Sequence, residues 1–284
     1  MTLHLRENKI FKSIAIGCLL FIIISCGNTL RLAVPEVFKQ QAAMYHVNGA
    51  RGNKMSFANF HTSKIKRGIH VSYPGWNRGF FLENLLLNMA GVQKNEIVRK
   101  EKAKFRYTLL DGKTEVEIYG EEKEIKRTIE YKLLNNDKNI FNSYRRLQNY
   151  SYVFSAIIKN PHLENDNPWE LVMTNVYDKK KENDQKLFKI LRPDDNGMAT
   201  NGIDTLYIKA VSLRDTESPN GKSGKLPVKM LSGYELSTTG GVVAIIDLID
   251  RNIWFYNELD EGERLNISAI STALFARKVN DTKW

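Results

Sequence analysis

Cysteine is almost absent from this 284-residue chain, which has only Cys18 and Cys26, both close to its start. Cys18 lies inside an apolar run, and the part of the chain from Cys26 onward holds a single sulfhydryl group. A single cysteine can form no disulfide within this part of the chain and no metal site with two or more cysteine ligands. This scarcity therefore excludes several classes of mechanism at once.

Histidine and the common catalytic motifs are also scarce. The chain has five histidines, and none forms an H-E-x-x-H or H-x-H pair. The G-x-S-x-G motif of serine hydrolases is missing, and residues 221–223 (G-K-S) lack the first glycine of a phosphate-binding loop because Thr216 stands in its place. We therefore expect no catalytic residue, no metal and no cofactor. The alternative is a hydrolase whose site gathers scattered acidic residues with His61 or His70.

A short uncharged run lies near the start of the chain. Arg6, Lys9 and Lys12 come first, and residues 14–24 follow without a single charge. At about 1.5 Å per residue, this run covers roughly half of a ~30 Å bilayer core, which is too short to span it comfortably. A positively charged start followed by such a run is typical of an export signal.

The run ends in residues 23–26 (I-I-S-C), which resemble the lipobox of bacterial lipoproteins. The resemblance implies diacylglyceryl transfer to the Cys26 thiol, cleavage after Ser25 and acylation of the new amino terminus. It also implies a membrane-anchored protein of the bacterial cell envelope. The residues directly after Cys26 are not acidic, which favours a periplasm-facing location. The alternatives are a plain secretory signal and an uncleaved membrane anchor.

One globular domain is expected to follow the signal. Apolar residues make up 42% of the full chain and aromatic residues 10%, which is enough for a hydrophobic core. No long linker divides the sequence. We therefore expect a signal peptide over residues 1–25, a lipidated tether over residues 26–33 and a β-rich domain over residues 34–284.

Alternation of apolar and polar residues predicts an antiparallel sheet. Phe105, Tyr107 and Leu109 alternate with polar residues, and residues 111–112 (D-G) mark a hairpin turn. The pattern continues through residues 116–132. Further strands are predicted at residues 45–49, 55–70, 150–158, 169–177, 205–213, 229–236, 241–249 and 252–256. Helices are predicted at residues 34–41 and 80–89, a turn or short helix at 135–146, and polar loops at 193–204 and 215–225.

The end of the chain predicts an enclosed helix. Residues 264–278 carry apolar or small side chains around most of a helical circumference, and Asp260 and Glu263 have the spacing of a capping box. Arg277 and Lys278 would complement the helix dipole. A helix that is apolar on most sides must be covered, most simply by the preceding sheet. The fold class is therefore mainly β (α+β), with an antiparallel sheet, barrel or sandwich, a buried C-terminal helix and one or two short helices.

This order of elements is similar to the tubby C-terminal and scramblase-like barrel superfamily. The likeness is carried by residues 240–256 (G-G-V-V-A-I-I-D-L-I-D-R-N-I-W-F-Y) and residues 265–276 (L-N-I-S-A-I-S-T-A-L-F-A). It implies a phosphoinositide- or lipid-adjacent module and not an enzyme.

Positive charge is concentrated in one segment. Residues 51–106 hold twelve lysine or arginine residues against three glutamates, so this segment carries +9 of the chain's net charge of +10. Such charge suits an anionic membrane surface or an acidic protein partner, whereas export makes nucleic acid an improbable ligand. The residues expected to contact an anionic surface are Lys64, Lys66, Arg67, Arg78, Arg99, Lys100 and Lys102. The alternative is a solvated face without a ligand.

Together these features predict a lipid-anchored, non-catalytic envelope protein. Its β-rich domain would bind a partner or an anionic component of the envelope, or it would serve as a scaffold in a larger envelope assembly.

Overall fold

The computed structural model describes residues 32–68, 100–132, 143–162, 167–178, 195–217 and 223–277. The lipobox-like residues 23–26 and the helix expected at 80–89 lie outside the described residues. Two units are distinguished by their contacts, one of residues 1–31 with 214–227 and one of residues 32–213 with 228–284. The second unit is described below. Neither helix of the described ranges is long and apolar enough to cross a membrane.

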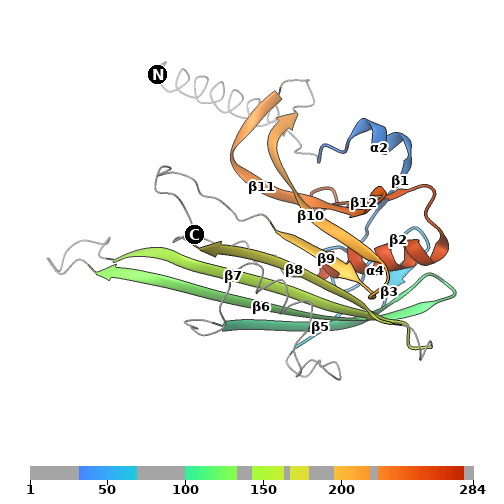
Figure 1. Ribbon diagram of the computed structural model, residues 1–284, viewed down its shortest axis with the longest axis horizontal. Helices are drawn as coiled ribbons and strands as arrows, with labels where there is room; N and C mark the ends of the chain where they lie inside the picture. Colours follow the sequence, from blue (N-terminus) through green and yellow to red (C-terminus); the bar gives the residue numbers. More distant parts are fainter. Residues whose placement is uncertain are drawn as a thin grey trace, which may run out of the picture. The chain divides into compact units, whose positions relative to one another are not determined.

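The described residues form one thirteen-stranded antiparallel sheet with two helices (Figure 1). From β1 the strand order runs to β13, then backwards through the sequence to β5, and then to β3 and β2, while β4 also pairs with β5. This order is that of an antiparallel meander, as predicted. The helices are α2 (Glu36–Gln40) and α4 (Glu261–Ala276). The strands are β1 (Ala42–His46), β2 (Ser56–Phe57), β3 (Phe60–Thr62), β4 (Lys66–Arg67), β5 (Lys100–Leu110), β6 (Glu115–Lys132), β7 (Ser143–Lys159), β8 (Trp169–Asp178), β9 (Asn196–Thr200), β10 (Thr205–Glu217), β11 (Ser223–Thr238), β12 (Gly241–Asp247) and β13 (Asn252–Tyr256).

The two ends of the sheet meet through a single bridge. β1 stands at one end of the strand order and β2 at the other. Just after β1, Asn48 exchanges two backbone hydrogen bonds with Ser56 of β2, with N···O distances of 2.9 and 3.1 Å. Phe57 of β2 also stacks on Phe255 of β13, with ring centroids 6.3 Å apart. The sheet is therefore a nearly closed barrel with a narrow seam.

Helix α4 is enclosed by this sheet, which confirms the predicted buried C-terminal helix. The capping box is also confirmed, because the Asp260 carboxylate accepts the Glu263 N–H at 2.7 Å and the Glu263 carboxylate accepts the Asp260 N–H at 2.9 Å. Ten residues of α4 are buried, and the seven apolar ones share one core with the inward-facing side chains of the strands. The Tyr107 hydroxyl of β5 donates to Thr272 at 2.9 Å. The buried residues of α4 are Leu265, Ile267, Ser268, Ala269, Ile270, Ser271, Thr272, Ala273, Leu274 and Ala276.

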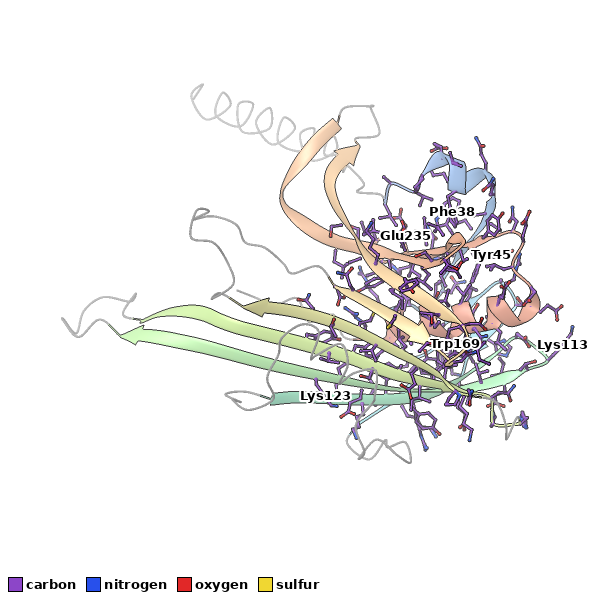
Figure 2. All side chains as sticks on the ribbon, in the orientation of Figure 1. Phe38, Tyr45, Lys113, Lys123, Trp169 and Glu235 are labelled. Atoms are coloured by element: carbon purple, nitrogen blue, oxygen red, sulfur yellow. The ribbon has the colours of Figure 1, made fainter. Side chains whose placement is uncertain are left out.

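Helix α2 carries Phe38 (Figure 2). On the other face of the sheet, Phe38 shares a second hydrophobic cluster with Ile245 of β12 and Trp254 of β13. Residues 244–246 of β12 are all buried for this reason, since Ala244 and Ile246 meet the core around α4 and Ile245 meets the α2 cluster. Burial on both faces explains why this strand reads as a continuous apolar run and does not alternate.

Three segments predicted from their polarity as loops or turns are partly strand. Residues 196–200 of the expected loop 193–204 form β9, and the expected loop 215–225 contains the ends of β10 and β11. Residues 143–146, expected to be a turn or short helix, belong to β7. Sheet pairing overrides local composition here, because a polar segment gains a full ladder of backbone hydrogen bonds when both neighbouring strands are in place.

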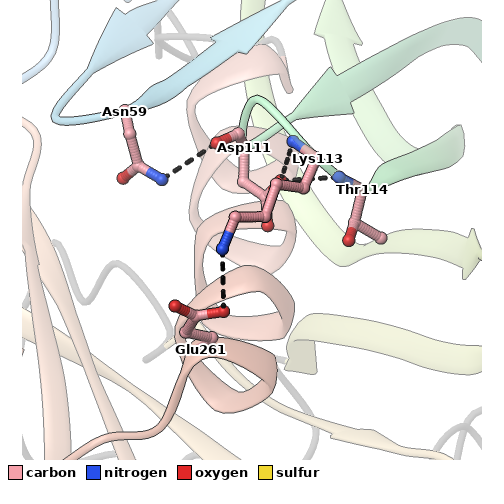
Figure 3. A network of polar contacts seen from close by, with 5 residues as sticks. All are labelled: Asn59, Asp111, Lys113, Thr114 and Glu261. Atoms are coloured by element: carbon pink, nitrogen blue, oxygen red, sulfur yellow. Dashed lines mark hydrogen bonds and ion pairs between the residues drawn. The ribbon is translucent and has the colours of Figure 1, made fainter.

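The β5–β6 hairpin is fixed at its turn by Asp111 (Figure 3). Its carboxylate accepts the N–H groups of Lys113 and Thr114 at 2.8 and 2.7 Å, and Gly112 supplies the positive φ of +96°. The Asn59 amide donates to the Asp111 carbonyl at 3.0 Å, and Lys113 lies 3.7 Å from Glu261 at the start of α4. The predicted hairpin is thus confirmed, with a four-residue connection.

Gly120 of β6 has no side chain, and the Phe105 ring packs directly against its backbone. A Cβ atom on Gly120 would lie 2.3–2.7 Å from three atoms of the Phe105 ring. We expect Gly120→Ala to lower the free energy of unfolding by about 1–3 kcal/mol in urea denaturation. Gly240→Ala is the matched control, because the only neighbour near its added Cβ would be Thr238 Oγ1 at 3.5 Å. Equal losses in both variants would contradict this account.

Candidate functional site

A row of polar side chains crosses three strands on the face of the sheet that points away from α4. Alternation along β5 buries Phe105 and Tyr107 in the core and leaves Arg106 exposed on the opposite face. In the register of the sheet, Arg106 lies opposite Lys66 of β4 on one side and opposite Tyr119 of β6 on the other. The three side chains therefore share one face and one level of the sheet.

This row forms the floor of a surface hollow of about 260 Å³. The segment between β3 and β4 forms its side and is joined to β5 by two hydrogen bonds. The Ser63 N–H donates to the Thr108 carbonyl and the Thr108 N–H donates to the Ser63 hydroxyl oxygen, both at 2.9 Å. These bonds hold Lys64 and Lys66 at the hollow. The lining residues are Ser63, Lys64, Lys66, Arg106, Tyr107, Thr108, Glu117 and Tyr119.

Positive charge exceeds negative charge in the hollow. Three of its lining residues are cationic, namely Lys64, Lys66 and Arg106, and one, Glu117, is anionic. Among the residues that the structure describes, no carboxylate lies within ion-pair distance of any of the three cations. The hollow is thus a concave, solvent-accessible site with an unbalanced positive charge.

Tyr119 contributes a neutral hydroxyl group to this site. Its hydroxyl donates to Glu117 Oε2 at 3.2 Å. Burial raises the pKa of the Tyr119 hydroxyl above its usual value and the Glu117 carboxylate raises it further, while Arg106 acts in the opposite direction. The phenol therefore stays protonated at neutral pH, and its one hydrogen is donated to the Glu117 carboxylate.

The residues predicted to contact an anionic surface fall into three groups in the structure: those that line the hollow, one that bonds the end of α4, and those outside the described part. Lys64 and Lys66 line the hollow, as expected of surface cations. Arg67 is different, because its guanidinium donates to the Ala276 carbonyl at the end of α4 at 2.6 Å and lies 5.4 Å from the centroid of the Phe105 ring. Lys100 and Lys102 belong to β5, but their side chains are outside the described part, as are Arg78 and Arg99 entirely.

Arg106 is the residue that the sequence-based selection missed. Its signal was present in the alternation of Phe105 and Tyr107 with polar neighbours, which places residue 106 on the exposed face. The pairing with Lys66 could not be read from the sequence, because the register between β4 and β5 depends on the sheet.

A second polar cluster is buried at the C-terminal end of α4. Arg277 forms an ion pair with Asp195, and the two side chains are only 3% and 4% exposed. The Tyr234 hydroxyl donates to the same Asp195 oxygen at 2.8 Å. The Arg277 guanidinium lies 5.3–5.8 Å from the ring centroids of Tyr152, Phe154 and Tyr234. Arg277 thus enters the core, where the sequence suggested only a residue that complements the helix dipole.

The aromatic residues around Arg277 remain uncharged. Burial raises the pKa of Tyr152 and of Tyr234 well above the usual value, although the Arg277 charge acts to lower both. The Tyr152 hydroxyl donates to the buried Glu122 carboxylate at 3.1 Å. Within the described residues, Asp195 Oδ1 and the Nε and Nη1 atoms of Arg277 have no hydrogen-bond partner. This arrangement fixes the end of α4 in place.

The residues considered for a hydrolase are not brought together in the described part of the chain. His61 is an exposed residue of β3, no hydrogen bond or ion pair joins it to a described carboxylate, and His70 lies outside the described ranges. Asp247 accepts the N–H groups of Ile249 and Asp250 and so shapes the β12–β13 turn. Over the described ranges, no group of three histidine, cysteine or acidic residues is arranged to hold a metal ion.

In comparisons with protein-family models, with curated proteins and with solved structures, nothing matches this chain.

The buried ion pair generates a second prediction. Arg277→Met leaves the Asp195 charge buried without its partner, so we expect a loss of about 3–5 kcal/mol in the free energy of unfolding. Adding Asp195→Asn removes that charge, and the double variant should regain part of the loss even though it carries two substitutions. Urea denaturation of the wild type, both single variants and the double variant measures the coupling. Additive losses would contradict a direct interaction between the two side chains.

Proposed function

We propose that this protein is a lipid-anchored, non-catalytic binding protein of the bacterial cell envelope, and that its β-rich domain binds an anionic envelope component. The observation that carries this proposal is the hollow beside β4, β5 and β6, where three cations face one carboxylate. The lipobox-like residues 23–26 supply the expected location, with Cys26 held in a membrane leaflet outside the cytoplasm.

The location and the charge of the hollow support each other. Each lysine or arginine near an anionic leaflet contributes roughly 1 kcal/mol to membrane association. Lys64, Lys66 and Arg106 form a local group of this kind on an exposed face of the sheet. An anchored protein also stays near the leaflet continuously, so that a modest affinity for an anionic component suffices for occupancy.

The chemistry of the hollow favours binding over catalysis. Its charged groups are three cations and Glu117, and the Ser63 hydroxyl oxygen accepts a backbone N–H from Thr108. A hydrolytic site needs a nucleophile, or a water, beside a general base in hydrogen-bond reach. The lining residues present donors and positive charge, which is the composition of a site that holds an anion.

Lipid attachment is tested at Cys26 itself. We expect mass spectrometry of the protein from cell membranes to show an amino-terminal Cys26 that carries a diacylglyceryl group and a further acyl chain. Cys26→Ser should keep its amino-terminal segment and lose the lipid, because the thiol is the attachment atom. An intact, unmodified amino terminus in the wild-type protein would overturn the anchoring part of the proposal.

Binding to an anionic surface is tested separately with the full chain carrying Cys26→Ser. We expect more of it to co-sediment with vesicles that contain anionic lipid than with neutral vesicles, which report apolar attachment alone. Raising the salt from about 0.1 M to about 1 M shortens the Debye length from about 10 Å to about 3 Å, so the difference between the two vesicle types should largely disappear. Equal binding to both at low salt would contradict an electrostatic interaction.

A further inference from the structure

The row of Lys66, Arg106 and Tyr119 departs from the charge pattern on both sides of it. At one neighbouring level of the sheet Lys104 of β5 lies opposite Glu121 of β6, and at the other Glu117 of β6 lies opposite Lys159 of β7. In the row itself two cations, Lys66 and Arg106, are direct register partners. Like charges at opposite positions of adjacent strands destabilise a sheet. An anion held between these two side chains converts that repulsion into attraction.

The size of the hollow limits what it can hold. Its volume of about 260 Å³ is below the range of roughly 300–1,000 Å³ in which pockets enclose drug-sized ligands. The hollow therefore suits one headgroup or one small anion, with the rest of a larger molecule left outside.

The charge of the hollow selects among small anions. Three cations and Glu117 leave a net charge of +2 on its lining. A phosphomonoester carries about −1.5 to −2 at neutral pH, which matches this value. A carboxylate or a phosphodiester carries a single negative charge and would leave one of the cations unbalanced.

The donors of the hollow also fit a terminal phosphate group. Arg106 provides a planar guanidinium, which pairs well with phosphate oxygens, and the two lysines provide compact ammonium groups. The Ser63 hydroxyl accepts the Thr108 N–H and so keeps its own hydrogen available, whereas the Tyr119 hydroxyl already donates its hydrogen to Glu117 Oε2. Three terminal oxygens of a phosphomonoester accept hydrogen bonds from several such donors at once.

We infer that the hollow lined by Lys64, Lys66, Arg106 and Tyr119 binds the terminal phosphate of a phosphomonoester. This inference rests on the proposed function, because it names the chemical class of the anionic component. A terminal phosphate occurs both on a lipid headgroup of the phosphatidic acid type and on small soluble phosphate esters. The recognised group is the same in both, and the experiment separates the two sources.

Calorimetric titration of the full chain in an uncharged detergent tests this directly. The probes are short-chain phosphatidic acid, short-chain phosphatidylglycerol, glycerol 3-phosphate and inorganic phosphate. We expect phosphatidic acid to bind at least about tenfold more tightly than phosphatidylglycerol, because the diester lacks one charge and one terminal oxygen. Binding of glycerol 3-phosphate or inorganic phosphate as well identifies a soluble source, and binding of phosphatidic acid alone identifies a lipid source.

Two results separate the failure of this inference from the failure of the proposed function. Equal affinity for phosphatidic acid and phosphatidylglycerol, together with salt-sensitive binding to anionic vesicles, would overturn the phosphomonoester and leave the proposed function standing. No binding to any probe or to anionic vesicles would overturn both.

Substitutions in the row give an independent readout. Lys66→Gln and Arg106→Gln should each weaken phosphatidic acid binding by about tenfold. Lys209→Gln is the control, since Lys209 is an exposed lysine of β10 whose register partner is Asn196. The Lys209→Gln variant should bind phosphatidic acid with the affinity of the wild type. A loss in the control as large as in the row would show that only the total charge matters and would overturn the site.

The same variants carry a signature that a purely structural role would not produce. Because Lys66 and Arg106 are like-charged register partners, Lys66→Gln should leave the urea midpoint of the unliganded protein unchanged or raise it, while binding is lost. Added phosphatidic acid should raise the midpoint of the wild type and leave that of Lys66→Gln and Arg106→Gln nearly unchanged. A lower midpoint in the unliganded variants with wild-type affinity would assign the row to the fold and overturn the inference.

Discussion

The described barrel depends on hydrogen-bond partners for the backbone carbonyl groups at the C-terminal end of α4, which lies inside it. The last carbonyl groups of a helix have no partner within the helix and carry partial negative charge, and in an enclosed helix water cannot reach them freely. Two arginines hold this helix end, and one of them, Arg67, bonds a terminal carbonyl of the helix. Arg67 of β4 donates to the Ala276 carbonyl, and Arg277 is held against Asp195 between three aromatic rings. The core can therefore close around the helix end without leaving it exposed.

This constraint connects the core to the hollow through neighbouring residues. β4 is two residues long, and alternation sends Arg67 to the end of α4 and Lys66 to the hollow. On β5, Tyr107 donates to Thr272 of α4, while Arg106 beside it lies in the row. The strands that present the cations are thus the same strands that fasten the helix. Lys66 stands beside Arg67, an exposed residue bonded to the end of α4, and Arg106 stands between Phe105 and Tyr107 of the core.

Local patterns were enough to predict the elements but not their partners. The alternation at Phe105, Tyr107 and Leu109 and the Asp260–Glu263 spacing predicted a strand and a helix start that the structure confirms. The failures involve pairing with another element, whether near or far along the chain. β9 lies within the polar segment 193–204 and becomes a strand because β8 and β10 flank it, and Arg277 contacts Asp195 at a separation of 82 residues. Neither the register nor such a contact leaves a signal within a short window of sequence.

The basic segment shows why net charge alone is a weak guide to a binding site. In the sequence, Lys66, Arg67, Lys104 and Arg106 contribute equally to the +9 of residues 51–106. In the fold, Arg67 serves the helix end and Lys104 lies opposite Glu121, whereas Lys66 and Arg106 lie opposite each other. Of these residues, only Lys66 and Arg106 are like-charged register partners, and their repulsion does not stabilise the described fold. Selection of a binding residue therefore rests on which charges the fold leaves uncompensated, and the sheet register determines that.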